Sequence, residues 1–407
     1  MDTVATSSPT ATGTTRPPRR RLRLLIVLGG LSAFGPLSLD MYLPALPALA
    51  RDFAVPDAGV QLTLTSCLIG LAVGQLIAGP LSDRWGRRVP LLIGLAGYVV
   101  ASVLCAFAPN VTAMTGLRAL QGIAGAAGIV ISRAVVRDLY EGAAVARFFS
   151  LLMLVNGMAP ILAPVVGGQL LRFTSWRGVF LVLAVIGAVL LAATVVVVGE
   201  TLPAARRRSG GLGQTFRSFG SLLRDPGFVR PALAGGLAFA AMFSYISASS
   251  FVLQKTYGLD PQQFSIAFAA NALGIMLLGQ GNARLLRSRS PHTLLTAGIA
   301  LCATGGGALL LSVLTGLGVV AVLISLFALV SSIGLIMPNA TALSMSGHPE
   351  AAGTASALLG LLQFALGGVA APLAGLGGNG AALPMALAIA ACAAAAVTVH
   401  LWPMRRS

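Results

Sequence analysis

Residues 79–88 read Gly-Pro-Leu-Ser-Asp-Arg-Trp-Gly-Arg-Arg, and a long apolar segment lies on each side of them. A short basic stretch in that position predicts a tight turn at one face of a membrane. Gly79 and Gly86 are expected to let the two flanking helix ends approach closely, because glycine has no Cβ. The charged residues of the turn are Asp83, Arg84, Arg87 and Arg88. The charges alone also fit an ordinary solvated loop. The spacing G-x-x-x-D-R-x-G-R-R is more specific than the charges as an indication of the kind of protein.

The composition excludes a soluble globular protein. The chain is 56% hydrophobic and 9% charged, with a mean hydropathy of +0.88, whereas soluble domains carry about 25% charged residues. A soluble fold of 407 residues with so little charge would expose large apolar patches and aggregate. We therefore expect an integral membrane protein whose surroundings are the lipid bilayer.

The chemistry-bearing residue types point away from nucleic acid, metal and catalysis. The net charge is +16, but the arginines sit in short clusters between apolar runs and form no continuous basic face. The cysteines lie inside apolar runs and are expected to be packing residues: Cys67, Cys105, Cys302 and Cys392. The sequence has no His/Asp/Glu cluster and no Gly-rich nucleotide loop, so we expect no enzyme, no cofactor, no metal and no nucleic-acid partner.

The apolar segments predict twelve membrane spans. About 20 apolar residues at 1.5 Å per residue cross a hydrocarbon core of about 30 Å. The predicted spans lie near residues 24–44, 60–82, 89–108, 112–135, 147–170, 178–198, 230–252, 262–283, 292–312, 317–343, 353–376 and 381–402. The fold class is thus an all-α integral membrane protein.

A long polar segment divides the chain into two halves of six spans. Some residues recur 200 positions later: Gly79, Arg84 and Arg87 as Gly279, Arg284 and Arg287, and Gly167-Gly168 as Gly367-Gly368. Two pseudo-symmetric halves are the plan of transporters with a midplane site. The expected parts are a disordered basic tail (1–23), an N-terminal half (24–199), a cytoplasmic linker (200–229), a C-terminal half (230–402) and a short tail (403–407).

The basic residues predict the orientation in the membrane. With both termini in the cytoplasm, 22 of the 27 basic residues fall on the cytoplasmic side, four fall outside and Arg118 lies within a span. Positively charged loops stay inside. We expect a multi-pass membrane protein with cytoplasmic N- and C-termini.

Asp40 and Arg118 are the charges that the spans enclose, and intramembrane charges are functional candidates by default. Asp40 lies about 6 Å of helix rise from the outer end of the first span, and Arg118 lies about 9 Å from the outer end of the fourth. The two charges therefore share a depth and are hypothesised to be partners in proton coupling. Two alternatives stay open: Asp40 at a frayed helix end, and Arg118 reaching to the outer interface.

Other span residues are candidates for a cavity or a gate. Candidate cavity groups are Tyr42, Gln61, Gln121, Asn156, Tyr245, Asn271, Asn339 and Gln363. The fifth span carries prolines and glycines, which bend helices and permit close packing: Gly157, Pro160, Pro164, Gly167 and Gly168. Helix packing alone explains these small residues almost as well as a gating surface does.

These stretches together resemble the major facilitator superfamily over about residues 24–402. More narrowly, Asp40-Met-Tyr-Leu-Pro-Ala-Leu-Pro47, Gly199-Glu200-Thr201-Leu202 and Gly334-Leu-Ile-Met-Pro338-Asn339-Ala-Thr-Ala342 resemble the Bcr/CflA (bicyclomycin/chloramphenicol-resistance) branch of drug–proton antiporters. Arg118-x-x-Gln121-Gly122 resembles the proton-coupling motif. Ala163-Pro164-x-x-Gly167-Gly168 resembles the antiport motif, with Ala163 where the pattern has glycine.

The resemblance implies a role for the 79–88 turn and an activity. In the family this turn helps to hold the cytoplasmic side shut, so Asp83 is expected to contact helix N-termini or an arginine such as Arg133 or Arg137. The implied activity is proton-coupled export of small amphipathic drugs by a monomer, with a drug and protons as partners. An exporter or importer of an endogenous metabolite is the alternative.

Overall fold

The structure is a computed structural model that describes residues 18–140, 143–207, 219–347, 352–374 and 382–402. In these ranges the regular structure is helical. The N-terminal half contains α1 (Pro18–Ser32), α2 (Phe34–Asp40), α3 (Leu46–Asp52), α4 (Asp57–Trp85), α5 (Arg88–Ala106), α6 (Val111–Leu139), α7 (Ala143–Leu170) and α8 (Trp176–Val197). The C-terminal half contains α10 (Pro226–Phe251), α11 (Pro261–Leu285), α12 (Pro291–Thr315), α13 (Val319–Met345), α14 (Ala352–Leu373) and α15 (Ala382–Leu401).

The helices confirm the membrane fold. Among the described residues, nine helices are long and apolar enough to cross a membrane, and the bent pair α1 and α2–α3 makes a tenth span. The remaining expected spans, the fifth and eleventh, coincide with α7 and α14. Their apolar portions at 158–170 and 358–373 are shorter than the other spans. Each of the twelve expected spans therefore has a helix at its position.

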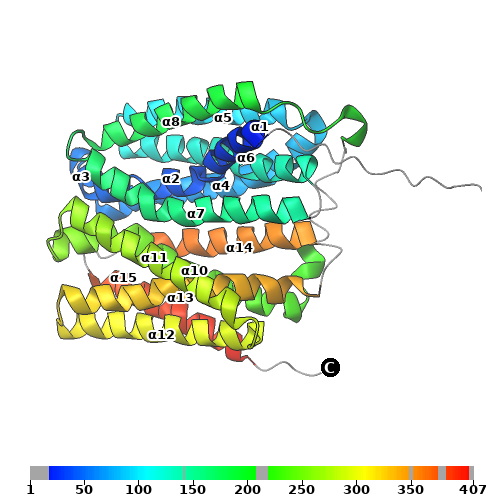
Figure 1. The fold of residues 1–407 in the computed structure, drawn as a ribbon. Coiled ribbons are helices and arrows are strands. Elements are labelled where there is room, and N and C mark those ends of the chain that lie inside the picture. Colours follow the sequence, from blue (N-terminus) through cyan, green and yellow to red (C-terminus); the bar gives the residue numbers. More distant parts are fainter. Residues whose placement is uncertain (1–17, 141–142, 208–218, 348–351, 375–381, 403–407) are drawn as a thin grey trace, which may run out of the picture.

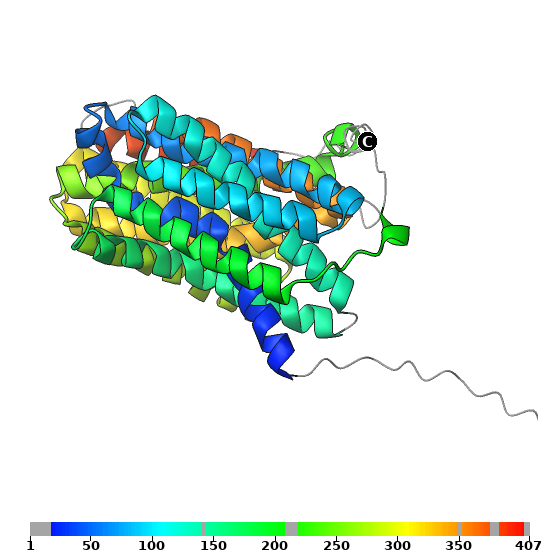
Figure 2. The same cartoon turned by 90° about the horizontal axis from the view of Figure 1, so that it is seen from above.

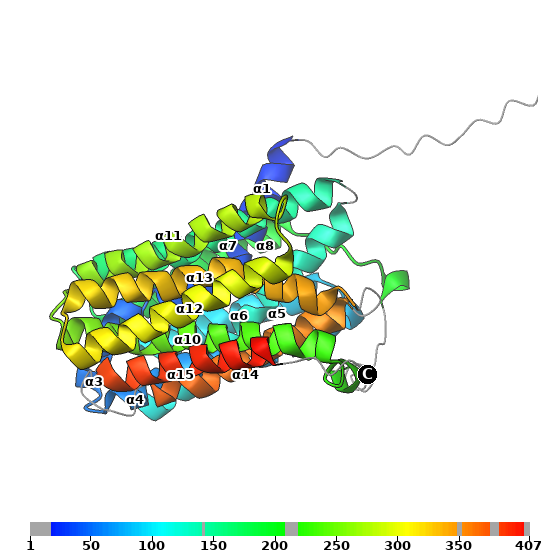
Figure 3. The same ribbon diagram turned by 90° about the horizontal axis from the view of Figure 1, so that it is seen from below.

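The two halves lie one above the other in Figure 1, with the blue-to-green helices over the yellow-to-red ones. The packing pattern repeats: α4 and α5 both pack on α6 and α5 packs on α8, as α11 and α12 pack on α13 and α12 packs on α15. Figures 2 and 3 show the same long helices running along one axis from above and from below. Across the boundary, α7 contacts α11 and α4 contacts α14.

The first span is broken, because proline interrupts its backbone hydrogen bonds twice. Pro36 has no N–H to give to Ser32 O, and the helix axis bends by 41° between Ser32 and Phe34. Pro44 likewise has no N–H for Asp40 O, and α2 ends at Asp40. The chain then passes through a short 3₁₀ turn, η1 (Leu43–Ala45), into α3. The single helix expected over 24–44 is therefore two helices, and Asp40 terminates the second.

Glycine permits a close helix crossing in each half. A Cβ on Gly122 of α6 would lie 2.2 Å from Cys67 O of α4. In the second half, a Cβ on Gly334 of α13 would lie 2.3 Å from Ile275 O of α11. Only a residue without a side chain allows the backbones to approach this closely. The two crossings occupy equivalent places in the two halves.

The proposed divisions of the chain involve residues outside the described ranges. Residues 1–17 of the expected 1–23 tail, residues 208–218 of the expected 200–229 linker, and the whole 403–407 tail lie there. The boundaries of the five parts stay predictions.

Four hydrogen bonds join the halves at the end of the bundle where α3 and α4 meet. Pro47 has no N–H for Leu43 O, and the Ser250 hydroxyl of α10 donates to that carbonyl at 2.6 Å. The other three run from Gln254 Nε2 to Pro44 O (3.2 Å), from Lys255 Nζ to Asp57 Oδ1 (2.5 Å) and from Gln262 Nε2 to Gly168 O (2.9 Å). We call these contacts the outer seal, because the basic-residue pattern predicts that this end faces the outside.

Candidate functional site

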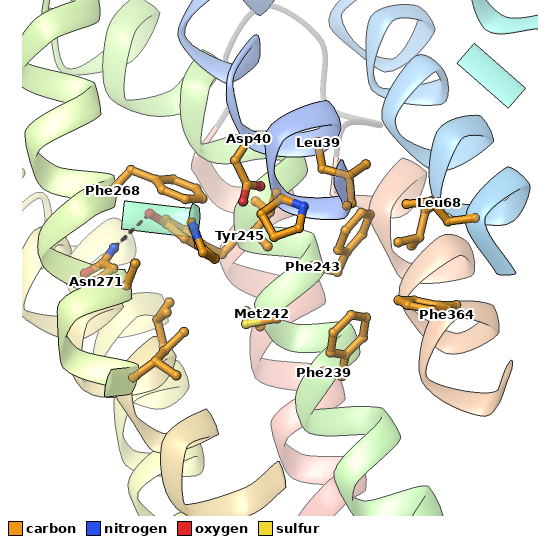
Figure 4. A pocket seen from close by; sticks show the side chains of 18 of the residues that line it. Leu39, Asp40, Leu68, Phe239, Met242, Phe243, Tyr245, Phe268, Asn271 and Phe364 are labelled. Atoms are coloured by element: carbon orange, nitrogen blue, oxygen red, sulfur yellow. Dashed lines mark hydrogen bonds between the residues drawn. The ribbon is translucent and has the colours of Figure 1, made fainter. Parts of the chain in front are cut away.

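A cavity of about 320 Å³ lies at the boundary between the halves. Helices α1, α2, α4, α6 and α7 of the first half and α10, α11, α13 and α14 of the second contribute to its wall. Its surface is largely aromatic and aliphatic. Figure 4 shows side chains that line it, and those labelled are Leu39, Asp40, Leu68, Phe239, Met242, Phe243, Tyr245, Phe268, Asn271 and Phe364. Such a wall suits an apolar molecule with few polar groups.

Asp40 brings a carboxyl group into this apolar wall. The residue is 7% exposed, and it makes no hydrogen bond or ion pair with the described residues. Its position follows from the break in the first span, because α2 ends at Asp40 beside the cavity. A buried carboxylate without a partner is costly. The carboxyl group is therefore poised to take up a proton or a positively polarised ligand group.

Arg118 does not pair with Asp40 in this structure. Its side chain is fully buried in α6, where Nη2 donates to Ser38 O of α2 at 2.8 Å and Nη1 donates to Gln121 Oε1. The guanidinium lies over the Tyr42 ring at 4.3 Å. Ser38 O belongs to the last turn of α2, whose carbonyls lack partners inside the helix and carry partial negative charge. Arg118 thus clamps the end of the helix that bears Asp40.

A polar network extends from Arg118 into the first half. Gln121 Nε2 donates to the Ser102 hydroxyl at 2.7 Å, and the hydroxyls of Ser38 and Tyr98 lie 2.8 Å apart. The burial of both side chains contradicts the two alternatives to pairing. Asp40 ends α2 but is 7% exposed, so this helix end is packed and not frayed. The Arg118 side chain is fully buried, so it does not reach an interface. The predicted shared depth agrees with the position of both residues near the end of α2. The predicted pairing between them is absent from this structure.

Only some expected cavity residues line the cavity. Tyr245 and Asn271 do, and Gln363 lines a second cavity of about 420 Å³. Three others lie within the helix packing of a half: Tyr42 beside Thr63, Gln121 beside Ser102, and Asn339 beside Asn282. Their polar groups serve contacts between helices of one half, whereas Gln61 is buried on α4 with an Oε1 that accepts no hydrogen bond from the described residues. The side chain of Asn156 lies outside those that the structure describes.

The second cavity adjoins the first on the side away from the outer seal. The two cavities share Gln75, Arg133 and Phe364. The wall of the second also contains Thr341 and Gln363 and is more polar than the first. A polar cavity, which we call the vestibule, thus adjoins the apolar cavity that contains Asp40. Arg133, expected as part of a gate, lies where the two cavities meet.

Residues 79–85 of the expected turn continue α4, and Gly86 and Arg87 connect it to α5. The charged cluster also differs from the expected one: Asp83 at the end of α4 pairs with Arg87, and Arg87 Nε donates to Asp138 Oδ2 at the end of α6 at 3.0 Å. The expected partner of Asp83, Arg133 or Arg137, is thus replaced by Arg87, which is buried and reaches both acids at once. Arg84 is exposed, and Arg88 Nη2 donates to Val195 O at 3.0 Å.

Glu200 caps the start of α5. Its carboxylate accepts the backbone N–H groups of Arg87 (2.8 Å) and Arg88 (3.2 Å), as well as those of Thr201 and Leu202. Burial alone raises the pKa of Glu200, but these four N–H groups outweigh it and hold the pKa below its ordinary value. Negative charge at a helix N-terminus is favourable. Glu200 therefore ties the segment after α8 to the turn.

Gly86, but not Gly79, is required by the geometry of the turn. Gly86 has φ = 92°, and a Cβ there would lie 2.3 Å from Glu200 Oε2. The nearest atom to a Cβ on Gly79 is 3.9 Å away, which is ordinary contact. The expected close approach at Gly79 is wrong, because the neighbouring helix leaves room for a methyl group there.

Helix α7 makes contacts on both sides of the boundary. A Cβ on Gly167 would lie 1.8 Å from Met41 O at the break in the first span, and one on Gly168 would lie 2.3 Å from Ser265 Oγ of α11. Pro160 lines the cavity, and Pro164 lies one turn further along the helix. The side-chain environment of Gly157 lies outside the described part. The glycine pair thus lets α7 touch both halves at the outer seal.

Several functional residues carried signals that sequence reasoning missed. Phe239 and Phe243 are spaced by four residues on α10, a spacing that places them on one helix face toward the cavity. Asp138 lies at the end of a predicted span and Glu200 follows another. Each acid could therefore have been predicted to lie beside the arginines of the 79–88 stretch. Asp57 had no such signal, because its partner Lys255 lies 198 residues away. Within the described residues no group of three or more His, Cys, Asp or Glu side chains could hold a metal.

Comparisons with known proteins agree with the fold. The model of the Major Facilitator Superfamily matches residues 26–372. The chain is 41% identical to the uncharacterized MFS-type transporter YdgK of Bacillus subtilis, with 88% of this chain and 90% of that protein covered. It is 30% identical to the bicyclomycin resistance protein homolog of Haemophilus influenzae (94% and 96% covered) and 31% identical to multidrug resistance protein D of Escherichia coli (88% and 90%).

Solved structures show the same arrangement of helices. The nucleoside transporter NupG superposes with a TM-score of 0.75 at 12% identity, with 94% of this chain and 98% of that chain covered. The D-xylose–proton symporter superposes with a TM-score of 0.72 at 16% identity, with 93% and 96% covered. At these identities the likeness concerns the fold.

Proposed function

The chain belongs to the major facilitator superfamily, and we propose that it exports small amphipathic drugs from the bacterial cytoplasm in exchange for protons. The protein is a multi-pass membrane transporter and not an enzyme. Direction, cargo and coupling ion are the proposed elements. Support for drug cargo comes from relatives that are named as multidrug and bicyclomycin resistance proteins at 28–31% identity over most of the chain.

One observation carries the proposal: an unpartnered carboxyl group in an apolar cavity between two halves that move against each other in this fold. Asp40 is 93% buried, since 7% of its surface is exposed. In that setting the ionised carboxylate needs compensation, either by a proton or by a positively polarised group of the cargo. Proton and cargo therefore compete for one site, and competition of this kind produces antiport.

Arg118 is proposed to act as a positioning residue in this exchange. It holds Ser38 O, two residues before Asp40, and so fixes the end of α2 against α6. A change of charge on Asp40 alters the force on the helix end that Arg118 holds. The glycine contact of α7 with Met41 O lies on the same broken segment. Through these contacts a proton at Asp40 is coupled to the packing of α2, α6 and α7.

Alternating access is proposed to use the outer seal as one gate and the 79–88 cluster as part of the other. The outer seal joins the halves while both cavities lie on its inner side. This conformation would take up cargo from the cytoplasm through the vestibule at Arg133. Both termini are proposed to be cytoplasmic and the membrane to be the bacterial inner membrane. One chain supplies both walls of the cavity, which supports a monomer as the working unit.

Expression in a drug-sensitive bacterial host that lacks its own efflux pumps tests this proposal. The expected result is raised resistance to several chemically unrelated amphipathic drugs and lowered drug accumulation in energised cells. Unchanged resistance to the whole panel, together with export or import of a compound that the cell makes itself, would favour the metabolite transporter instead. Collapse of the pH gradient should abolish the effect if protons drive it.

A further inference from the structure

The wall of the cavity includes an unused hydrogen-bond acceptor in the first half and an unused donor in the second. The acceptor is the Asp40 carboxylate, which no described residue contacts by a hydrogen bond. The donor is the hydroxyl of Tyr245 on α10. Asn271 Nδ2 of α11 donates to the Tyr245 oxygen at 2.8 Å, and the neighbouring Ser249 hydroxyl on α10 lies outside hydrogen-bond geometry and accepts no proton from the described residues. Asp40, Tyr245 and Asn271 line the same cavity, and Figure 4 shows them at one end of it.

The Tyr245 hydroxyl is held firmly in place. Tyr245 is 1% exposed and Asn271 is 4% exposed, and the Tyr245 ring stacks on Phe268 with 5.6 Å between centroids and 19° between planes. Because Asn271 donates to the Tyr245 oxygen, the proton of the hydroxyl is available to a further partner that can accept it. A buried polar group with an unused donor favours a ligand that supplies the missing acceptor.

Other polar groups of the cavity do not duplicate this role. The Ser32 hydroxyl donates to Gly29 O inside its own helix. Gln75 and Arg133 belong to the part of the wall that is shared with the vestibule. The body of each described span in the second half is without charged residues, so Tyr245 and Asn271 are the polar groups through which that half can recognise cargo at the Asp40 end.

We propose that Tyr245 is a specificity-determining residue whose hydroxyl, oriented by Asn271, donates a hydrogen bond to an oxygen of the cargo. The cargo class that fits is an apolar, mostly aromatic molecule that carries a cationic or hydrogen-bond-donating group for Asp40 and an acceptor oxygen for Tyr245. This proposal rests on the proposed export of drugs and adds a chemical rule for which drugs are preferred. Each half of the protein then binds one of the two polar groups of the cargo.

Binding of two cationic probes to the purified full-length protein tests the rule. Rhodamine 6G carries an ester carbonyl, and tetraphenylphosphonium has no oxygen. A neutral hydrogen bond contributes about 0.5–1.5 kcal/mol, so Tyr245→Phe should weaken rhodamine 6G binding by about 2- to 10-fold. Tetraphenylphosphonium binding should stay unchanged. Asn271→Ala should give a smaller loss in the same direction, because the hydroxyl is then free to rotate.

The controls separate this proposal from a packing role and from the proposed function itself. Tyr257→Phe, on a tyrosine outside the cavity, should leave the affinities for both probes unchanged. Equal losses for both probes in Tyr245→Phe would show that the residue only packs, and no loss for either would show that its hydroxyl meets no cargo. Either result overturns the inference while drug binding stands. If the wild-type protein binds neither probe, the proposed drug cargo fails and takes the inference with it.

Discussion

Lys255 Nζ lies 2.5 Å from Asp57 Oδ1 and thereby joins the C-terminal half to the N-terminal half at the outer seal. Lys255 belongs to η3 (Val252–Thr256), a π-helical turn that continues α10, and its ammonium also lies 5.1 Å from the centre of the Phe251 ring. The Asp57 side chain is 5% exposed and the Lys255 side chain is 26% exposed, so the carboxylate is the buried member of the pair. Removing Lys255 costs more than loss of a surface pair, because the Asp57 charge stays buried without this ammonium.

Lys255→Met should open the outer seal. With the four native cysteines replaced by alanine, Ser265→Cys at the contact of α11 with α7 reports access from outside, since Ser265 is 2% exposed. We expect a membrane-impermeant maleimide to label this cysteine several-fold faster when Lys255→Met is added. Arg177→Met breaks an ion pair with Asp52 inside one half and serves as the control. An unchanged labelling rate in Lys255→Met would remove this pair from the gate.

Arg118→Lys should destabilise the protein although it keeps the charge. Two nitrogens of the guanidinium reach two acceptors, Ser38 O and Gln121 Oε1, and a single ammonium reaches only one of them in that geometry. An unsatisfied buried acceptor costs about 1–3 kcal/mol. Thermal unfolding of the purified protein in detergent should show a lower midpoint, together with slower transport. A midpoint at or above that of the wild type would contradict the clamp at the end of α2.

Gly86→Ala and Gly79→Ala form a matched pair in the 79–88 turn. Gly86 has φ = 92° and its missing Cβ position lies 2.3 Å from Glu200 Oε2, so alanine there is strained in its backbone and collides with the carboxylate. Such backbone strain costs about 1–3 kcal/mol. Gly79→Ala should be neutral or mildly stabilising, because Gly79 lies inside α4 and the nearest atom to its added Cβ is at 3.9 Å. Thermal unfolding checks both, and equal midpoints for the two variants would show that the turn does not need Gly86.

The stability that the Glu200 cap contributes to the fold should fall when the pH is lowered. The pKa of Glu200 is held below its ordinary value in the folded protein, so the charged carboxylate stabilises the fold. This contribution is complete above the unfolded-state pKa of about 4.3 and is lost as the pH falls through the lower folded-state pKa. The difference in unfolding midpoint between wild type and Glu200→Gln should thus stay constant from pH 7 to pH 5 and shrink below that. A difference that grows on acidification would contradict the sign of the shift.

The spans were predictable because length and apolar content alone fix a membrane helix. The expected spans 89–108 and 292–312 correspond to α5 (Arg88–Ala106) and α12 (Pro291–Thr315). The break in the first span was also encoded, since Pro36 and Pro44 each remove a backbone donor. It was not foreseen, because hydropathy averages over such interruptions.

The site was harder to predict, because the sequence gives the depth of a residue but not the direction in which its side chain points. The predicted depths placed Arg118 level with Asp40. The acceptor that Arg118 uses is instead Ser38 O, a backbone carbonyl in the last turn of α2. Tyr42 and Asn339 have suitable depths as well, but their polar groups bond inside one half. Of the proposed cavity residues, Tyr245 and Asn271 were placed on the cavity because their helices turn those faces to the boundary.

Transport driven by a pH gradient in Asp40→Asn tests the exchange of proton and cargo most directly. The assay follows rhodamine 6G uptake into everted membrane vesicles with an acidic interior, at matched protein levels. Asp52→Asn is the control, because Asp52 is an exposed acid bonded to Trp176 and Arg177, away from the cavity. The account predicts that Asp40→Asn loses gradient-driven uptake while Asp52→Asn keeps it. Uptake by Asp40→Asn at the wild-type rate and with the wild-type pH dependence would contradict it.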